Sequence, residues 1–514
     1  MRSTILIIVF SVVFIVLNFR FFSVACTRSG DYALIELEVE KIHQGFYPLS
    51  GAYSRFKIHH ISPALFYYYA VTEHMLPFLK SVRGKHLFAQ LLLNIFFLYF
   101  AIKITKEVFS GEIFGTTLLF LSLWIFLSLG KHIFFNTWNP VVVVVPMLAF
   151  ALAALGVAFG YIKYLPLLFF TAIVAAGSHL GALVPCLAIV LTSIFLYIIN
   201  HNSRNASSAQ KRISIILSSV LVISLLLPVL LDLFYNGFSS NITRIFKFSL
   251  RQGQGHTFSE SVSYIASFYY LPFRQVMPFA SSPTVRVTVF IALLFLPWTA
   301  LKKLSKEAVY LNIILLLGIA AAVFSATRMP GKLYHYLSWY NFSFASLLYL
   351  SIIISPITIF KEFKISKFAV RIINTKLATA LLCFAVTLVV YTKYQNAPKE
   401  CSDLQARFLS FVGKKKNIQT QLVLKDADSW KVAAPLALSM LREKIDFCIS
   451  RGWGFMFGRE FACTGKSGAR ATRLGKEKLV FYKRNEYNLA REGDKLLLKK
   501  WIILKKTTEL INDN

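Results

Sequence analysis

The stretch SGDYALIE at residues 29–36 follows directly on the first long apolar segment and places a carboxylate, Asp31, just past a predicted membrane boundary. An amphipathic run to residue 44, a Gly/Pro turn over 45–51 and the cluster YSRFKIHH at 53–60 come next. The chain has only 24 acidic residues against 56 basic ones, and ionisable groups at a membrane boundary are functional candidates. We therefore predict that Asp31 is catalytic. The alternative is a helix N-cap.

The bulk composition defines the class of protein. Of the 514 residues 56% are hydrophobic, and the mean hydropathy is +0.59. A soluble protein of this length could not bury so much apolar surface, so we predict a polytopic membrane protein. The net charge of +32 does not indicate a nucleic-acid partner, because the basic residues crowd the loops beside apolar segments, where they fix topology and meet anionic headgroups.

The apolar segments predict an all-α membrane domain with about eleven transmembrane helices. They lie at 4–25, 86–104, 112–130, 140–160, 164–178, 180–200, 213–234, 286–301, 308–326, 337–360 and 377–393. With a cytoplasmic N-terminus, every loop predicted inside is short and basic, as the positive-inside rule requires. The same topology places Asp31, the loop 235–285 and the C-terminal tail on the external face.

Two external regions have structure of their own. In the first external loop, 26–85, we predict helices at 32–44 and 62–78 that lie at the membrane surface, with Glu36 to Glu40 as a wet face; whether 62–78 spans the membrane stays open. After a membrane domain over 1–394, residues 395–514 predict a small external α+β domain with strands at 419–424, 478–482 and 496–504 and a helix at 428–445. Cys401, Cys448 and Cys463 could supply a disulfide there, but the sequence does not choose the pair.

The first external loop resembles that of a known superfamily. A first span followed by GDYALIELEVEKIHQGFYPLSGAYSR (30–55) and HHISPALFYYYA (59–70) is similar to GT-C-type membrane glycosyltransferases, the superfamily of protein O-mannosyltransferases and lipid A aminoarabinose transferases. The segments NTWNPVVVVVP (136–146), GSHLGALVP (177–185) and SWKVAAPLALSMLREKIDFCISRGWGFMFG (429–458) add to the resemblance. Tyr32 stands where mannosyltransferases often carry a second acidic residue, so the subfamily is not set.

The resemblance implies a reaction and a location. It implies transfer of a hexose or pentose from a polyprenyl-phosphate donor to an external hydroxyl on a glycan, lipid or protein acceptor, with inversion and with Asp31 as general base. It also implies a bacterial inner (plasma) membrane. No cofactor is expected; the reaction requires no metal, and no ligand spacing for one stands out, although a divalent cation stays open.

The chemistry then selects further candidate residues. Cations must meet the charge on the leaving lipid phosphate, and the external candidates are Arg328, Lys332, Arg55, Lys57 and Arg251. The alternative for each is a charge that faces lipid headgroups. For substrate contacts we expect Glu36, Tyr53, His59, His60, His179, Tyr334 and His335. The alternative for the histidines is a hydrogen-bonded structural role. We interpret the glycine-rich loop 235–285 as a lid and Trp138 as the interfacial start of a span.

Two other classes of function are compatible with a basic polytopic chain. A transporter or flippase of lipid-linked sugars would be expected to place charged groups in mid-span, and the predicted spans are nearly free of charge. A non-enzymatic envelope assembly protein would account for the tail but not for the composition of the first external loop. Both stay as alternatives to a transferase.

Overall fold

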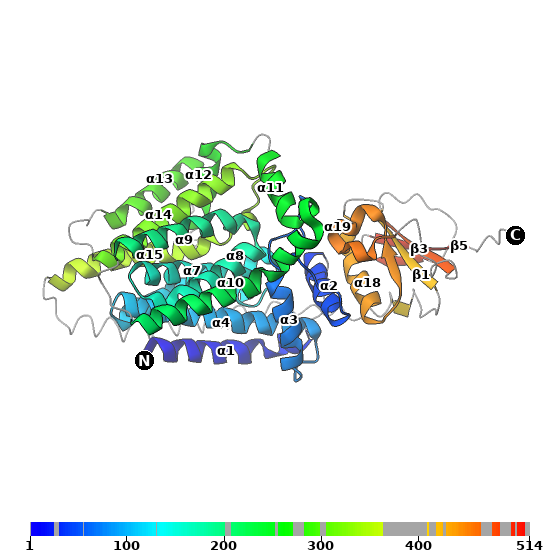
Figure 1. The fold of residues 1–514 in the computed structure, drawn as a ribbon, viewed down its shortest axis with the longest axis horizontal. Coiled ribbons are helices and arrows are strands. Elements are labelled where there is room, and N and C mark those ends of the chain that lie inside the picture. The colour runs from blue at the N-terminus through cyan, green and yellow to red at the C-terminus, as the bar shows by residue number, and fades with distance from the viewer. Residues whose placement is uncertain are drawn as a thin grey trace.

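A bundle of apolar helices, a layer of short helices at one of its ends, and a C-terminal α/β domain beyond that layer make up the protein (Figure 1). The computed structural model describes residues 2–24, 30–54, 56–129, 131–200, 207–251, 255–270, 282–298, 305–362, 409–410, 418–424, 428–463, 475–483, 495–498 and 501–508.

The bundle is built from long apolar helices. They are α1 (Arg2–Val24), α4 (Val82–Val108), α5 (Glu112–Ser128), α6 (Asn139–Val142) continued by α7 (Val144–Ala158), α8 (Leu165–Ser178), α9 (Leu183–Ile199), α10 (Ser208–Asn236), α13 (Pro283–Phe295), α14 (Lys306–Thr327) and α15 (Asn341–Glu362). Within the described ranges five helices are long and apolar enough to cross a membrane, and five shorter apolar ones accompany them. Each of the first ten predicted spans coincides with one of these ten helices, and the eleventh, 377–393, lies outside the described residues.

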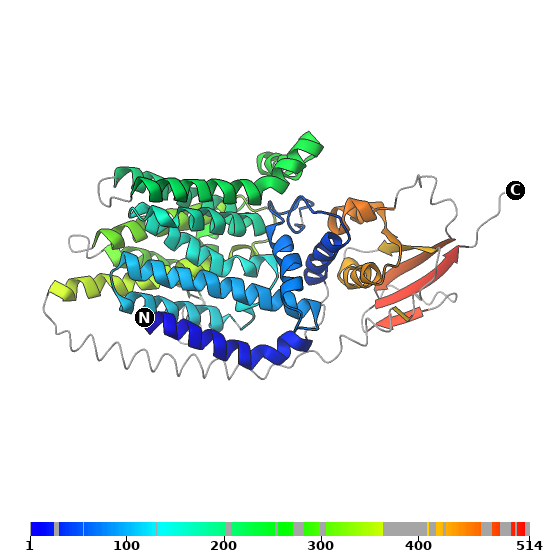
Figure 2. The same cartoon turned by 60° about the horizontal axis from the view of Figure 1, so that its bottom comes forward.

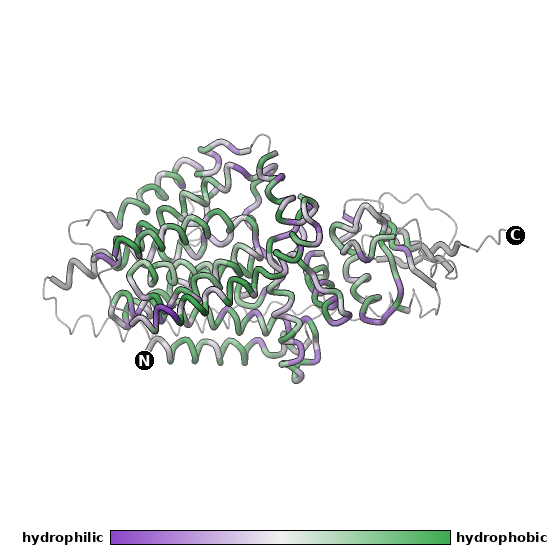
Figure 3. The backbone as a smooth tube through the Cα atoms, viewed as in Figure 1, coloured by the Kyte–Doolittle hydropathy of each residue, from purple (hydrophilic) through white to green (hydrophobic). Residues whose placement is uncertain are grey.

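Helix α7 is the axis of the bundle. Every residue of α7 is buried, and the helix packs against α4, α8, α9 and α15. Its run of alanines, with Gly156, lets these neighbours approach closely. By contrast α10 keeps its apolar side chains exposed, as a lipid-facing helix does. Figure 3 shows the hydrophobic residues running along the bundle helices, with hydrophilic ones more frequent towards their ends.

The two predicted surface helices are present as α2 (Asp31–His43) and α3 (Ala64–Met75). Helix α2 lies between the bundle and the C-terminal domain, as both ribbon views show (Figure 2). Its residues Ala33, Leu34 and Leu37 join the core of that domain. The predicted wet face is wrong, because the C-terminal domain covers it: the Glu36 side chain is 1% exposed, and those of Glu38 and Glu40 are 14% and 18% exposed.

The segment 235–285 is only partly a loop. Within it α11 (Asn241–Arg251) is amphipathic, and α12 (Phe258–Tyr270) packs against α13, α14 and α15. Residues 264–270 of α12 are all buried. The interpretation of the whole segment as a lid is therefore wrong for α12, which is part of the bundle.

The C-terminal domain contains a five-stranded mixed sheet in the order β2-β1-β3-β5-β4. Its elements are β1 (Ile418–Leu424), α18 (Trp430–Arg442), β2 (Phe447–Ile449), α19 (Gly454–Phe457), β3 (Gly475–Lys483), β4 (Lys495–Leu498) and β5 (Trp501–Thr508). Strand β1 pairs in parallel with β2 and β3, and β5 pairs antiparallel with β3 and β4, so the single strand expected at 496–504 is two strands. A disulfide joins Cys448 to Cys463, which settles a pairing that the sequence left open; Cys401 lies outside the described residues.

Candidate active site

Asp31 is the first residue of α2, and its carboxylate is held by two donors from distant segments. The Tyr53 hydroxyl donates to Oδ1 at 2.9 Å, and the indole Nε1 of Trp138 donates to Oδ2 at 2.8 Å. The N-cap of α2 is Gly30, and no side chain caps this helix end. The carboxylate of Asp31 is therefore not engaged as a cap, and the positive end of the helix dipole still stabilises its charge.

The surroundings of Asp31 change its basicity in opposite directions. Burial raises the pKa of its carboxyl above the ordinary value, and the hydrogen bonds from Tyr53 and Trp138 with the nearby Lys431 ammonium oppose the rise. The net effect is a raised pKa. A carboxylate of raised pKa accepts a proton more readily than an exposed aspartate does.

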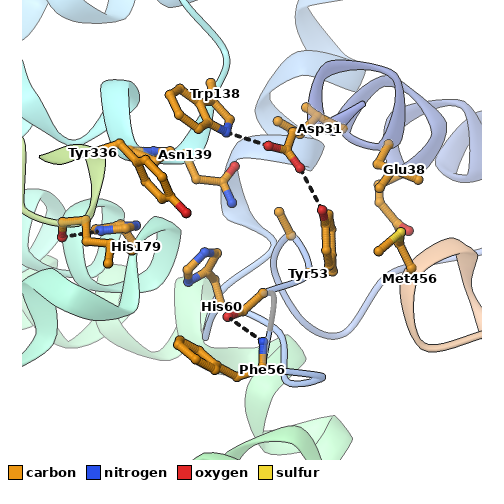
Figure 4. A pocket seen from close by; sticks show the side chains of 16 residues that line it. Asp31, Glu38, Tyr53, Phe56, His60, Trp138, Asn139, His179, Tyr336 and Met456 are labelled. Carbon is orange, nitrogen blue, oxygen red and sulfur yellow. Dashed lines mark hydrogen bonds between the residues drawn. The ribbon is translucent and has the colours of Figure 1, made fainter. Parts of the chain in front are cut away.

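A pocket of about 120 Å³ opens beside this carboxylate. Figure 4 shows its lining side chains, contributed by α2, the loop 52–60, Trp138 with the start of α6, the α8–α9 connection, the loop before α15, and Met456 of α19. Aromatic rings of Tyr53, Phe56, Trp138 and Tyr336 line it together with neutral polar groups. Such a lining, in which apolar and aromatic side chains surround a few convergent polar groups, is typical of small-molecule sites.

A second cavity of about 510 Å³ adjoins the first through Glu38, which lines both. The turn 45–51, the ends of α10 and α11, and α19 form its walls. Its lining carries both signs of charge, with Lys41 and Arg244 beside Asp232 and Glu460. Lys41 bridges Glu38 and Glu460 at 2.7 Å each, so the turn that follows α19 is tied to α2 at the edge of the pocket.

The C-terminal domain fixes the start of α2. Gly30 N–H donates to the carbonyl of Lys431 at 3.0 Å, and Gly30 has φ +69°, a backbone conformation that favours glycine. The Trp430 ring packs edge-on against the ring of Tyr53, with centroids 5.6 Å apart. Both the backbone before Asp31 and its Tyr53 donor are thus held by the N-terminus of α18.

Several predicted site residues meet at this pocket. Tyr53, His60 and His179 line it with Asp31. His59 faces the second cavity instead, its Nδ1 lies 3.1 Å from the carbonyl oxygen of Gly51, and its backbone N–H donates to Asn241 Oδ1 at 2.9 Å. Sequence adjacency therefore did not bring His59 and His60 to the same site.

Others lie outside the pocket. Glu36 is held between Arg83 at 2.9 Å and Arg442 at 3.2 Å, in a buried ion-pair network rather than against substrate space. Lys57, Arg328 and Lys332 are exposed and line neither cavity. Arg55 lies outside the described residues, as does the side chain of Arg251.

The loop after α14 reaches the pocket through its rings. The Lys332 ammonium lies 5.5 Å from the Tyr334 ring centroid, Tyr334 stacks on Tyr336 at 5.6 Å, and Tyr336 packs on Trp138 at 5.1 Å. His335 faces away from this stack, towards Phe268 of α12. The predicted loop therefore contributes Tyr336 and Leu337 to the pocket wall, and Lys332 stands at the outer end of the stacked rings.

Sequence reasoning missed Trp138, Asn139, Tyr336 and Glu38 as site residues. Trp138 reads as an ordinary interfacial tryptophan, yet its indole N–H binds Asp31. The available signal was the polar segment NTWN directly before a fully apolar span. Among the described residues no group of three or more His, Cys, Asp or Glu side chains is placed to hold a metal ion.

The architecture defines a fold class: almost the whole chain shares its fold, an apolar helical bundle with a C-terminal α/β domain, with solved structures of ArnT. The particular protein it is similar to is ArnT from Cupriavidus metallidurans. The apo structure of ArnT matches with a TM-score of 0.56 and 13% identity over 98% of each chain. The structure of ArnT bound to undecaprenyl phosphate matches with a TM-score of 0.54 and 12% identity, over 98% of this chain and 97% of that one. No protein-family model and no curated protein sequence matches this chain.

Proposed function

We propose that the protein is a membrane glycosyltransferase that moves a sugar from a polyprenyl-phosphate donor to an acceptor hydroxyl on the external face of the membrane. The observation that carries the proposal is the Asp31 carboxylate, of raised pKa and open to a pocket at the end of an ArnT-like bundle. The undecaprenyl phosphate bound to the ArnT structure supports a lipid phosphate as the leaving group.

In the proposed step Asp31 acts as general base. The acceptor oxygen forms a bond to the anomeric carbon, the bond from that carbon to the phosphate oxygen breaks, and the hydroxyl proton passes to Asp31. Each carboxylate oxygen has two acceptor positions, and Tyr53 and Trp138 occupy one on each, so each oxygen keeps one for the acceptor. A single displacement inverts the anomeric centre.

The lipid phosphate departs with its electron pair and needs a cation near it. Among the predicted cations Lys332 and Arg328 are the best supported, because the Lys332–Tyr334–Tyr336 stack connects their loop to the pocket. The acceptor would enter through the second cavity, which reaches the pocket at Glu38. A bacterial inner membrane, with the C-terminal domain outside, is the proposed location.

The test substitutes Asp31→Asn, which preserves shape and removes the base. With labelled undecaprenyl-phosphate sugars as donors, we expect the full chain in membranes to release undecaprenyl phosphate and the variant to lose about 10²- to 10⁴-fold in rate. Binding of undecaprenyl phosphate by both proteins is the control for folding. Full transfer by the variant would exclude Asp31 as base, and no lipid-phosphate binding by the wild type would exclude the function.

The flippase alternative is less well supported by the buried groups of the bundle. In the described part of the bundle some buried polar groups pair with each other, such as Gln90 with Asn94 and Ser351 with Asn312. A conduit for a charged lipid headgroup would need polar or charged groups along its length. Helix α7, the axis of the bundle, has only apolar residues along its whole length.

A further inference from the structure

Two histidines from distant segments meet in the wall of the pocket. His60 and His179 are 8% and 4% exposed, and their ring centroids are 5.5 Å apart. Their segments are joined directly, because Ser62 N–H donates to the carbonyl of Gly177 at 3.1 Å. A Cβ on Gly177 would lie 2.6 Å from the Cβ of Ser62, so glycine at 177 is what permits this approach.

Backbone partners assign the tautomer of each ring. Leu180 N–H donates to Nδ1 of His60 at 3.0 Å, so this nitrogen carries a lone pair and the proton of the neutral ring is on Nε2. Nε2 of His179 lies 2.8 Å from the carbonyl oxygen of Leu337, which can only accept, so this nitrogen carries the proton. Nδ1 of His179 is therefore an acceptor, and it is buried without a partner among the described residues.

Both rings are neutral at physiological pH. Burial lowers the pKa of His60 well below its ordinary value, and the neighbouring His179 and His59 add to the effect. Burial also lowers the pKa of His179, to about 4. The other titratable groups that line the pocket are Asp31, Glu38, Tyr53 and Tyr336. The pair thus presents one N–H donor and one lone-pair acceptor.

We propose that the His60–His179 pair binds one hydroxyl of the transferred sugar, which accepts from Nε2 of His60 and donates to Nδ1 of His179. This inference rests on the proposed function, and it assigns the sugar ring to the pocket between Asp31 and His179, where Figure 4 places Asn139 and Tyr336. Only a group that both donates and accepts satisfies the pair. An ammonium group donates only, and a deoxy position does neither, so both are rejected at this ring position.

The test measures what the sugar adds to lipid binding. Full chain in nanodiscs is titrated with undecaprenyl phosphate and with the same lipid carrying glucose, mannose, galactose or arabinose. For the wild type we expect at least one sugar to raise the affinity over that of the bare lipid phosphate. His179→Phe should lower the affinity for that sugar-carrying lipid roughly tenfold, which corresponds to the loss of one good hydrogen bond. Its affinity for the bare lipid phosphate should stay unchanged. His179→Asn, which can return an acceptor to this position, should restore part of the affinity for the sugar-carrying lipid.

The control is His74→Gln, which changes an exposed histidine outside the pocket. The inference is overturned if none of the sugars raises the affinity, or if His179→Phe binds the sugar-carrying lipid as tightly as the wild type does. In either case, binding of bare undecaprenyl phosphate would leave the proposed function standing. Loss of binding even to bare undecaprenyl phosphate by the wild type would instead remove the proposed function. A readout without substitutions uses ¹⁵N-labelled histidine: the sugar lipid, and not the bare lipid, should shift the Nδ1 resonance of His179, and an unmoved resonance overturns the inference.

Discussion

At the scale of single residues, the two donors on Asp31 decide how it titrates. The Tyr53 hydroxyl and the Trp138 indole both stabilise the charged carboxylate, while burial destabilises it. Removing either donor therefore shifts the balance towards the protonated acid. A general base works only when it is deprotonated, so under the proposed function the two donors help to set the lowest pH at which transfer occurs.

Tyr53→Phe tests this balance. Loss of the hydroxyl should raise the pKa of Asp31, so the acidic limb of the kcat/KM profile for sugar transfer should move to higher pH by about one unit, the equivalent of one hydrogen bond to a charged group. Transfer should recover on the alkaline side of the new pKa. Tyr235→Phe, at a tyrosine that is 70% exposed, is the matched control and should leave the profile unchanged. An unmoved acidic limb in Tyr53→Phe would contradict the assignment of Asp31 as the titrating base.

At the scale of elements, α2 is clamped from two sides. Arg83 at the start of α4 and Arg442 at the end of α18 share the carboxylate of Glu36, and Gln44 at the end of α2 donates to the carbonyl of Leu441. Apolar residues on another face of α2 join the core of the C-terminal domain. Because Asp31 is the first residue of this helix, the clamp also fixes the position of the carboxylate that we propose as general base.

Glu36→Gln should destabilise the protein strongly. It leaves two guanidinium groups without their shared anion, and breaking a buried ion pair costs about 3–5 kcal/mol. A lowered unfolding temperature of the detergent-solubilised chain is the expected result. Glu112→Gln, in the Lys106–Glu112 pair with side chains 20% and 41% exposed, is the control and should cost less than about 1 kcal/mol. Equal unfolding temperatures for the two variants would show that the Glu36 network is not structural.

At the scale of the whole molecule, the residues of the candidate active site lie at one end of the bundle. Helix α2, the α8–α9 connection, the loop before α15 and the C-terminal domain gather there (Figure 1). Helices α6 and α7 start at the pocket with Asn139, and the basic residue Lys163 follows the other end of α7. The Cys448–Cys463 disulfide fits an oxidising external compartment for this end. In the proposed function, this arrangement would let a lipid-borne donor reach the pocket from the membrane and an acceptor reach it from outside.

Topology can be measured with single cysteines. Lys444→Cys in the C-terminal domain should react with a membrane-impermeant maleimide on intact cells, and Lys163→Cys should react only after the membrane is opened. The unmodified chain gives the background from its native cysteines. Labelling of both positions in intact cells would mean that the number of spans between them is off by one.

The helices and strands that could be predicted from the sequence are those that depend on local residue patterns. Apolar runs predicted ten helices of the bundle, and residue patterns and a capping signal predicted β1 and α18. These features survive because hydrophobic periodicity and helix signals act over a few residues. The role of Asp31 as a catalytic residue stays a prediction.

Which residues contact each other over long distances in the sequence became clear from the tertiary structure alone. Trp138 is 107 residues from the aspartate that it binds, His179 meets His60 across a separation of 119, and Glu36 is buried by a domain some 400 residues away. The tertiary structure also chose Cys448–Cys463 and turned part of an expected lid into α12. Such contacts depend on how whole helices pack, so the residue types in one stretch predict that a polar group needs a partner, but not which residue supplies it.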